Sequence, residues 1–101
     1  MKVEMDVFSG RPNPYWDLDA ETSTALRALL ARLGPTDRPA PEPPGLGYRG
    51  FVITDDDHRY RVYRTWVSSS RSTFLDPARS VEALLRDHIP DNLKSTLAGL
   101  V

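Results

Sequence analysis

The first residues of the chain alternate between polar and apolar side chains. Val3, Met5 and Val7 stand at every second position, with charged residues between them. This is the period of a β-strand that buries one of its faces. We therefore expect a strand over residues 2–8.

Three later segments carry apolar residues at helical spacing. Leucines recur from Leu26 to Leu33 after Asp19, a residue type that caps helix N-termini, and predict a helix over about residues 20–33. Asp76-Pro77 predicts the start of a second helix, which Pro90 ends. A short third helix is expected from three further leucines, Leu93, Leu97 and Leu100.

Two runs rich in β-branched and aromatic residues, 48–54 and 58–67, flank Asp55-Asp56-Asp57 and predict a hairpin with an acidic turn. One register, with Ile53 opposite Tyr60, collects the large apolar side chains on an inward face. These are Phe51, Ile53, Tyr60, Val62 and Trp66. A slip of one residue would move each of them to the other face, so we adopt this register.

Residues 34–47, between the first helix and the hairpin, contain five prolines and three glycines. We expect a semi-rigid connector without regular structure there. The element order is then β-α-β-β-α, and Ser72 to Leu75 could add a short strand. The expected fold class is α+β: a two-layer sandwich in which helices cover one face of a small antiparallel or mixed sheet of three or four strands.

The composition is that of one small domain over residues 1–101, with 40% hydrophobic and 27% charged residues. The chain has no cysteine, which excludes a disulfide framework, a thiolate zinc site and a cysteine nucleophile. The charged N-terminus lacks the apolar run of a signal peptide, and no segment is long and apolar enough for a membrane span. We expect a cytoplasmic protein without membrane contact.

Positive charge is concentrated in the middle of the chain, although the net charge is only −1. The stretch from His58 to Leu75 carries four arginines and no acidic residue, so it is the first region to examine for function. Arg59 and Arg61 could contact phosphates while Tyr63 stacks on bases. Strand-one acids are available to pair with these arginines, however, so we do not expect nucleic-acid binding.

The loop Ser9–Pro14 and the tryptophan after it form the most distinctive segment. Its two prolines restrict the backbone, and Gly10 permits a sharp turn. Arg11, Asn13 and Trp16 could therefore grip a ligand. The alternative is that the polar side chains cap local backbone while Trp16 fills the end of the core.

In the adopted register Arg49 stands opposite Arg64, and two like charges in such a pair require an anion between them. With Arg11 from the loop, three guanidinium groups could clamp a carboxylate or a phosphate. The alternative partner is an acid of the protein itself: Asp17, Asp19 or a neighbouring acid.

No arrangement of catalytic or metal-binding residues is evident. The Asp55–His58 segment lacks the ligand spacing and the glycine of a calcium loop. The serines at 68–70 lack the glycines of a nucleophile elbow. We expect no metal site, no cofactor and no catalytic residue.

The chain resembles short, uncharacterised bacterial proteins that share two of its segments, an SGRPNP-x-W loop and a PPGLGYRGF segment. The resemblance supports a joint importance of these two segments. It implies no activity, cofactor or catalytic residue.

The leading hypothesis is a non-catalytic module that binds an anionic small molecule or a peptide terminus. The expected ligand-binding residues are Arg11, Asn13, Trp16, Tyr48, Arg49 and Arg64. One alternative is a protein–protein interaction or homodimerisation domain that uses the hairpin edge. The third is a small enzyme in which arginines polarise an oxyanion and His58 or an aspartate acts as the base.

Overall fold

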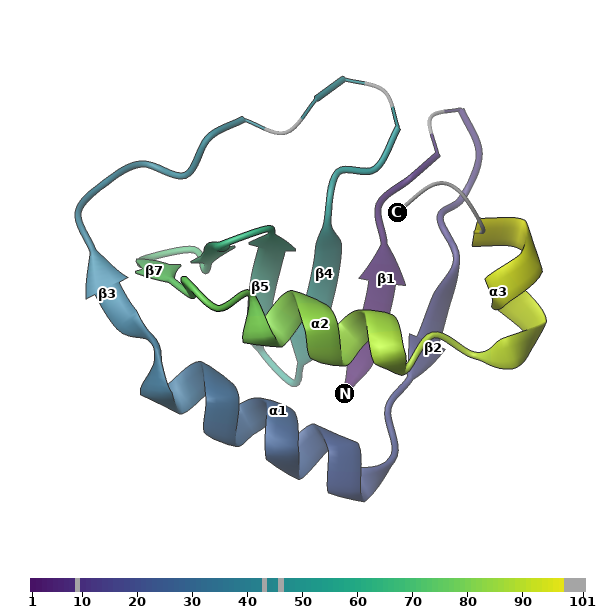
Figure 1. Ribbon diagram of the computed structural model, residues 1–101, viewed down its shortest axis with the longest axis horizontal. Helices are drawn as coiled ribbons and strands as arrows, with labels where there is room; N and C mark the ends of the chain where they lie inside the picture. Colours follow the sequence, from purple (N-terminus) through teal and green to yellow (C-terminus); the bar gives the residue numbers. More distant parts are fainter. Residues whose placement is uncertain (9, 43, 46, 98–101) are drawn as a thin grey trace.

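The computed structural model describes residues 1–8, 10–42, 44–45 and 47–97, and within them the chain forms seven strands and three helices (Figure 1). The strands are β1 (Lys2–Met5), β2 (Tyr15–Asp17), β3 (Gly34–Thr36), β4 (Phe51–Asp55), β5 (His58–Tyr63), β6 (Trp66–Ser68) and β7 (Thr73–Leu75). The helices are α1 (Ala20–Arg32), α2 (Ser80–Asp87) and α3 (Asp91–Leu97). All strands belong to one antiparallel sheet in the order β2-β1-β4-β5-β6-β7-β3.

The predicted fold class is wrong, because the sheet has seven strands rather than three or four. Four of them, β2, β3, β6 and β7, are only three residues long and too short to show an alternating pattern. The strand β3 even contains Pro35, and it opens the segment that the sequence predicts to be an irregular connector. Pro35 is tolerated because β3 is at the edge of the sheet and pairs on one side only, so the missing N–H is not needed for a second partner strand.

The predicted hairpin register is confirmed, since Ile53 pairs with Tyr60 between β4 and β5. The predicted second strand is too long, however, because a turn at Arg64-Thr65 divides it into β5 and β6. Trp66 then pairs with Tyr63 and lies on the opposite face from Val67, which is fully buried. The prediction that Trp66 points inward is therefore wrong.

Helices α1 and α2 occur where the sequence predicts them, but α2 begins later than predicted. The Asp19 carboxylate accepts the Thr22 N–H (2.7 Å) and caps α1 as expected. Helix α2 begins at Ser80, after a turn in which Arg79 has a φ of 55°. The Asp76 carboxylate still caps it, by accepting the Val81 N–H (2.8 Å).

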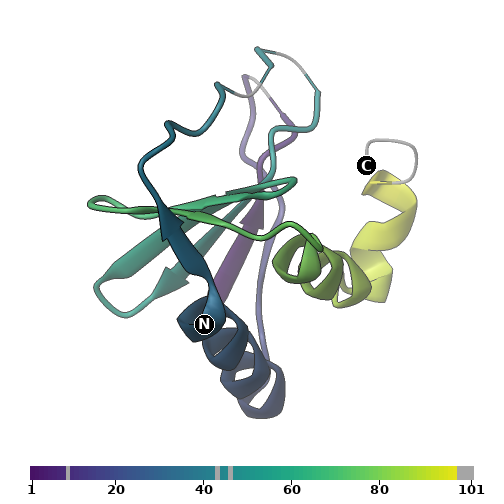
Figure 2. The same cartoon turned by 60° about the vertical axis from the view of Figure 1, so that its left-hand side comes forward.

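The core lies between one face of the sheet and the helices α1 and α2, which share that side (Figure 2). Its fully buried members include Val3, Met5, Phe51, Ile53, Val62 and Val67 from the sheet and Leu26, Val81 and Leu85 from the helices. None of the helices in the described ranges has both the length and the apolarity to cross a lipid bilayer. Ser9, Pro43, Leu46 and Leu100 of the predicted segments lie outside the described residues.

Candidate functional site

The loop segment and the segment before β4 meet at Asp6. Its N–H donates to the Gly50 carbonyl (2.9 Å), and its own carbonyl accepts the Arg49 N–H (2.8 Å). Two residues of one strand thus face one residue of the other, which is the pattern of a β-bulge. Gly50 has a φ of 96°, and a Cβ on it would lie 2.0 Å from the Val62 carbonyl oxygen. Only glycine fits this position.

The bulge places two guanidinium groups on one carboxylate. Arg49 Nη2 donates to Asp6 Oδ1 (2.8 Å) and to the Phe8 carbonyl (2.8 Å), and Arg61 Nη2 pairs with Asp6 Oδ2. Asp6 is only 8% exposed. Arg49 therefore has an acidic partner inside the protein, although that partner is Asp6 rather than Asp17 or Asp19.

Asn13 ties the loop together. Its Oδ1 accepts the Val7 and Phe8 N–H groups (3.0 and 2.8 Å), while its Nδ2 donates to Glu4 (3.2 Å) and Asp6 (3.3 Å). All four polar positions of the amide are used within the chain, so Asn13 stabilises the loop conformation.

The other two loop residues point in different directions. Arg11 is exposed and stacks over the Phe8 ring, with its Cζ 3.7 Å from the ring centre. Trp16 is buried in the core and packs edge-on against Phe51. The indole N–H of Trp16 is buried and has no hydrogen-bond partner among the described residues.

A second polar cluster surrounds Glu82 of α2, on the helix side of the sheet. The buried Glu82 carboxylate accepts the Tyr48 hydroxyl (2.6 Å), the Arg64 N–H (3.0 Å) and the Arg79 guanidinium (Nε, 3.0 Å). Burial alone would raise the pKa of Glu82, but these hydrogen bonds outweigh it and hold the pKa below its ordinary value. Burial, reinforced by the Glu82 carboxylate, raises the pKa of Tyr48.

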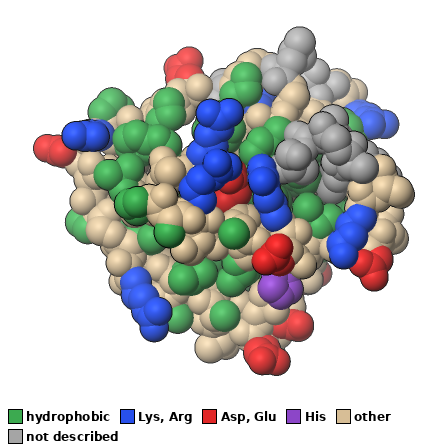
Figure 3. Space-filling view, in the orientation of Figure 1, with side chains coloured by type: hydrophobic (Ala, Val, Ile, Leu, Met, Phe, Trp, Pro, Cys, Tyr) green, Lys and Arg blue, Asp and Glu red, His purple; other side chains and the backbone are tan. Residues whose placement is uncertain are grey.

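Two more arginines lie over the aromatic rings beside Glu82. The Cζ of Arg86 is 5.5 Å from the centre of the Tyr48 ring, and that of Arg64 is 5.1 Å from the centre of the Tyr63 ring. The two rings contact each other, with centres 6.0 Å apart. Basic side chains accordingly gather in the middle of this face of the molecule, around a small acidic area (Figure 3).

The structure thus brings four of the six predicted site residues together in two pairs, and Arg11 and Trp16 belong to neither pair. Asn13 and Arg49 meet at Asp6, whereas Tyr48 and the backbone of Arg64 meet at Glu82. The guanidinium groups of Arg11, Arg49 and Arg64 have different neighbours, which are Phe8, Asp6 and Tyr63. A ligand role for these six residues stays a prediction.

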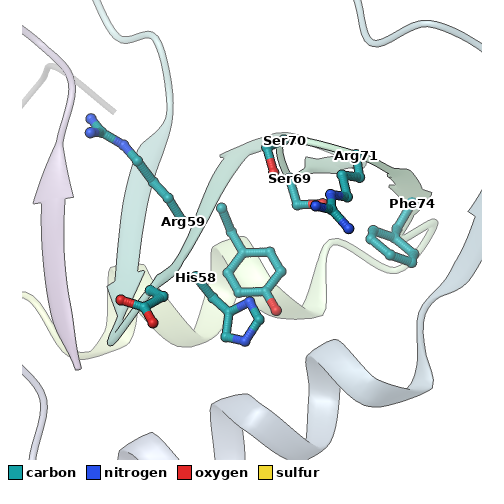
Figure 4. A pocket seen from close by; sticks show the side chains of 8 residues that line it. His58, Arg59, Ser69, Ser70, Arg71 and Phe74 are labelled. Carbon is teal, nitrogen blue, oxygen red and sulfur yellow. The ribbon is translucent and has the colours of Figure 1, made fainter.

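A cavity lies beside the first half of β5, apart from both polar clusters. We call it the edge cavity; it has a volume of about 470 Å³. Its wall includes His58, Arg59 and Tyr60 from β5, the turn residues Ser69, Ser70 and Arg71, and Phe74 from β7 (Figure 4). This volume falls in the range of small-molecule sites.

The edge cavity exists because β6 and β7 form a hairpin that is shorter than β5. Strand β6 ends at Ser68, opposite Arg61, and the Ser69 N–H then donates to the Ser72 carbonyl (2.8 Å). The chain therefore turns back at Ser70-Arg71 instead of continuing along β5. The side chains of His58 and Arg71 point into the gap, whereas Arg59 points to the other side of the sheet (Figure 4).

The edge cavity contains one arginine side chain, Arg71, that has no acidic partner among the described residues. In the described part of the chain, the arginines in ion pairs are Arg27, Arg49, Arg61 and Arg79. Neither Arg59 nor Arg71 is among them. Among the described residues that line the cavity, Asp57 is the one acid. The Ser70 hydroxyl adds a neutral hydrogen-bond donor.

The predicted site residues do not include Arg71 or the other residues of the edge cavity. The acid-free stretch from His58 to Leu75 points to this region of the sequence. It does not show that Arg71 faces the cavity while Arg59 lies on the other side of the sheet. No cluster of three or more metal-ligating side chains occurs among the residues with described positions. Comparison of the chain with protein-family models, with curated proteins and with solved structures found no match.

Proposed function

We propose that the protein is a non-catalytic binding module for an anionic ligand, and that the ligand occupies the edge cavity. The observation that carries the proposal is the Arg71 guanidinium, which has no ion-pair partner among the described residues and is directed into the edge cavity, next to Ser69 and Ser70. Guanidinium groups form strong, often bidentate hydrogen bonds with carboxylates and phosphates.

The walls of the cavity suit a ligand with an apolar part. The rings of His58 and Tyr60 stack with centres 6.5 Å apart, and Phe74 lies across the cavity from them. A second cavity of about 200 Å³ shares Tyr60 and Phe74 with the first and continues between Leu30 and Leu33. An anionic group beside Arg71 could thus extend an apolar tail toward α1.

The hydrogen bonding in the cavity favours binding over catalysis. The Ser69 hydroxyl donates to the Ser72 carbonyl (3.4 Å), not to His58. A serine nucleophile would need a base within hydrogen-bond reach, and His58 does not take that place.

The proposal is tested by titrating the protein with acetate, with 3-phenylpropionate and with inorganic phosphate, followed by NMR amide shifts. We expect the carboxylates to shift the amides of residues 58–60 and 69–71, with the phenyl compound binding more tightly. Arg71→Gln should weaken binding at least about tenfold, the equivalent of one charge-assisted hydrogen bond. The control is Lys94→Gln, which also removes one exposed positive charge, because Lys94 lies on α3, on the side of the molecule opposite β7 and the cavity wall (Figure 1).

Unchanged affinity in Arg71→Gln, with the melting temperature preserved, would overturn the assignment to the edge cavity.

A second candidate site is the arginine cluster at Tyr48, because the Arg86 Nε is buried there without a hydrogen-bond partner among the described residues. Loss of anion binding in Arg64→Gln, but not in Arg71→Gln, would place the ligand at this second site.

A further inference from the structure

We propose that the anion of the edge cavity is the carboxyl terminus of a peptide, bound as an added strand along the free edge of β5. This inference rests on the proposed function, because it names the class of ligand that the cavity accepts. A peptide would also use the backbone groups of β5 and the cavity on the other side of the sheet, which a small anion would not contact.

The first half of β5 has a strand on one side only. His58, Arg59 and Tyr60 pair with β4, but the pairing with β6 begins at Arg61. Among the described strands, none lies along the other side of these three residues. Such an edge spans roughly 10 Å of extended chain and is open to another strand.

The register identifies the backbone groups at this edge. Asp55 and His58 close a two-residue turn, so their N–H and C=O groups point toward each other. The backbone N–H and C=O groups of successive residues in a strand point in opposite directions. The N–H and C=O of Arg59 therefore point away from β4. Tyr63 closes the next two-residue turn with Trp66, which agrees with the same alternation. Arg59 thus presents one donor and one acceptor to an added strand.

The geometry favours a chain end over the middle of a chain. An added strand would lie in line with β6, where the turn at Ser69–Ser72 stands in its path. A peptide approaching this turn must stop there. The groups it meets are the Arg71 guanidinium and serine hydroxyls, which suit a terminal carboxylate rather than an ammonium group.

Cavities on both sides of the sheet meet at this edge. The edge cavity lies on the side of His58 and Tyr60, and another of about 240 Å³ lies on the side of Arg59 and Val52. Side chains of a strand alternate between the two sides of a sheet. An added strand could therefore place its last side chain near Tyr60 and Phe74 and the preceding one over Val52.

The probe for this inference is acetyl-Ala-Val-Leu with a free carboxylate, added to ¹⁵N-labelled protein. We expect the Arg59 amide to become protected from hydrogen exchange and the peptide to bind more tightly than acetate. The carboxamide form of the peptide, and the acid form with Arg71→Gln protein, should each bind at least about tenfold more weakly. Lys94→Gln protein should bind as wild type does.

Backbone methylation provides the decisive comparison. Two peptides are made, with an N-methyl group on the valine or on the leucine nitrogen. Because successive N–H groups of a strand point in opposite directions, one peptide should lose binding and the other should keep it. Equal binding of both, or a peptide that binds no better than acetate, would overturn the added strand while leaving the anion site intact. Absence of binding by every carboxylate would overturn the proposed function as well.

Discussion

The Glu82→Gln substitution tests whether the buried carboxylate holds α2 to the sheet. In the wild type, one Glu82 oxygen accepts the Tyr48 hydroxyl and the Arg64 N–H, and the other accepts the Arg79 side chain. Glutamine has one oxygen and one NH2 group in place of the two oxygens. At least one of the donors that face Glu82 must then lose its acceptor.

The cost follows from the burial of the group, which is 1% exposed. A buried donor without a partner costs about 1–3 kcal/mol, and bonds to the remaining neutral oxygen are weaker than those to a carboxylate. The Arg79 side chain is 45% exposed, so solvent screening reduces its share. We expect a loss of about 2 kcal/mol in the free energy of unfolding, or about 10 °C in melting temperature for a domain of this size.

The loss is measured by urea unfolding at several pH values. Because the folded protein lowers the pKa of Glu82, the carboxylate contributes its full stability above the ordinary glutamate value of 4.5. This contribution disappears as the pH falls through the lowered pKa. The gap between wild type and Glu82→Gln should thus be constant from about pH 6 to 8 and shrink below about pH 4.5.

The matched control is Glu42→Gln, which changes an exposed residue of the connector and should alter stability by no more than about 0.5 kcal/mol. The reasoning is refuted if Glu82→Gln unfolds at the same urea concentration as the wild type. It is also refuted if the gap between the two proteins stays unchanged as the pH falls from 7 to the lowest value at which both remain folded.

Two further substitutions test the bulge and the loop. Gly50→Ala should cost more than about 3 kcal/mol in urea unfolding, because the new Cβ would meet the Val62 carbonyl. In Gly10→Ala, φ is also positive but no atom lies within 4 Å, so only about 1 kcal/mol should be lost; equal losses would contradict the steric argument. Asn13→Ala should cost about 2 kcal/mol, because two loop N–H groups lose their acceptor. A loss no greater than that of the exposed Asn92→Ala would show that Asn13 does not hold the loop.

The elements that the sequence predicts correctly are those with a strong local signal. Helix α1 has a capping aspartate, a leucine stripe and a glycine after it, and these act within a few residues of each other. The register of β4 and β5 follows from a two-residue turn and from the need to bury Phe51 and Ile53 together. Such features depend little on the rest of the chain.

The strands that the sequence misses depend on partners far along the chain. Strand β3 pairs with β7, about forty residues later, and its proline would argue against a strand anywhere except at an edge. Three-residue strands carry no period of their own. Their conformation is determined by the strand beside them.

The arginines show the same division at the level of function. Their number and the acid-free stretch around them are properties of the sequence, and from these an anion site could be expected. Which arginine is available was decided by tertiary structure. The bulge at Gly50 brings Arg49 onto Asp6 and so neutralises it, while the early end of β6 leaves Arg71 beside an open edge. Charge can be counted along a chain, but whether a charge is paired depends on which distant residues the fold places next to it.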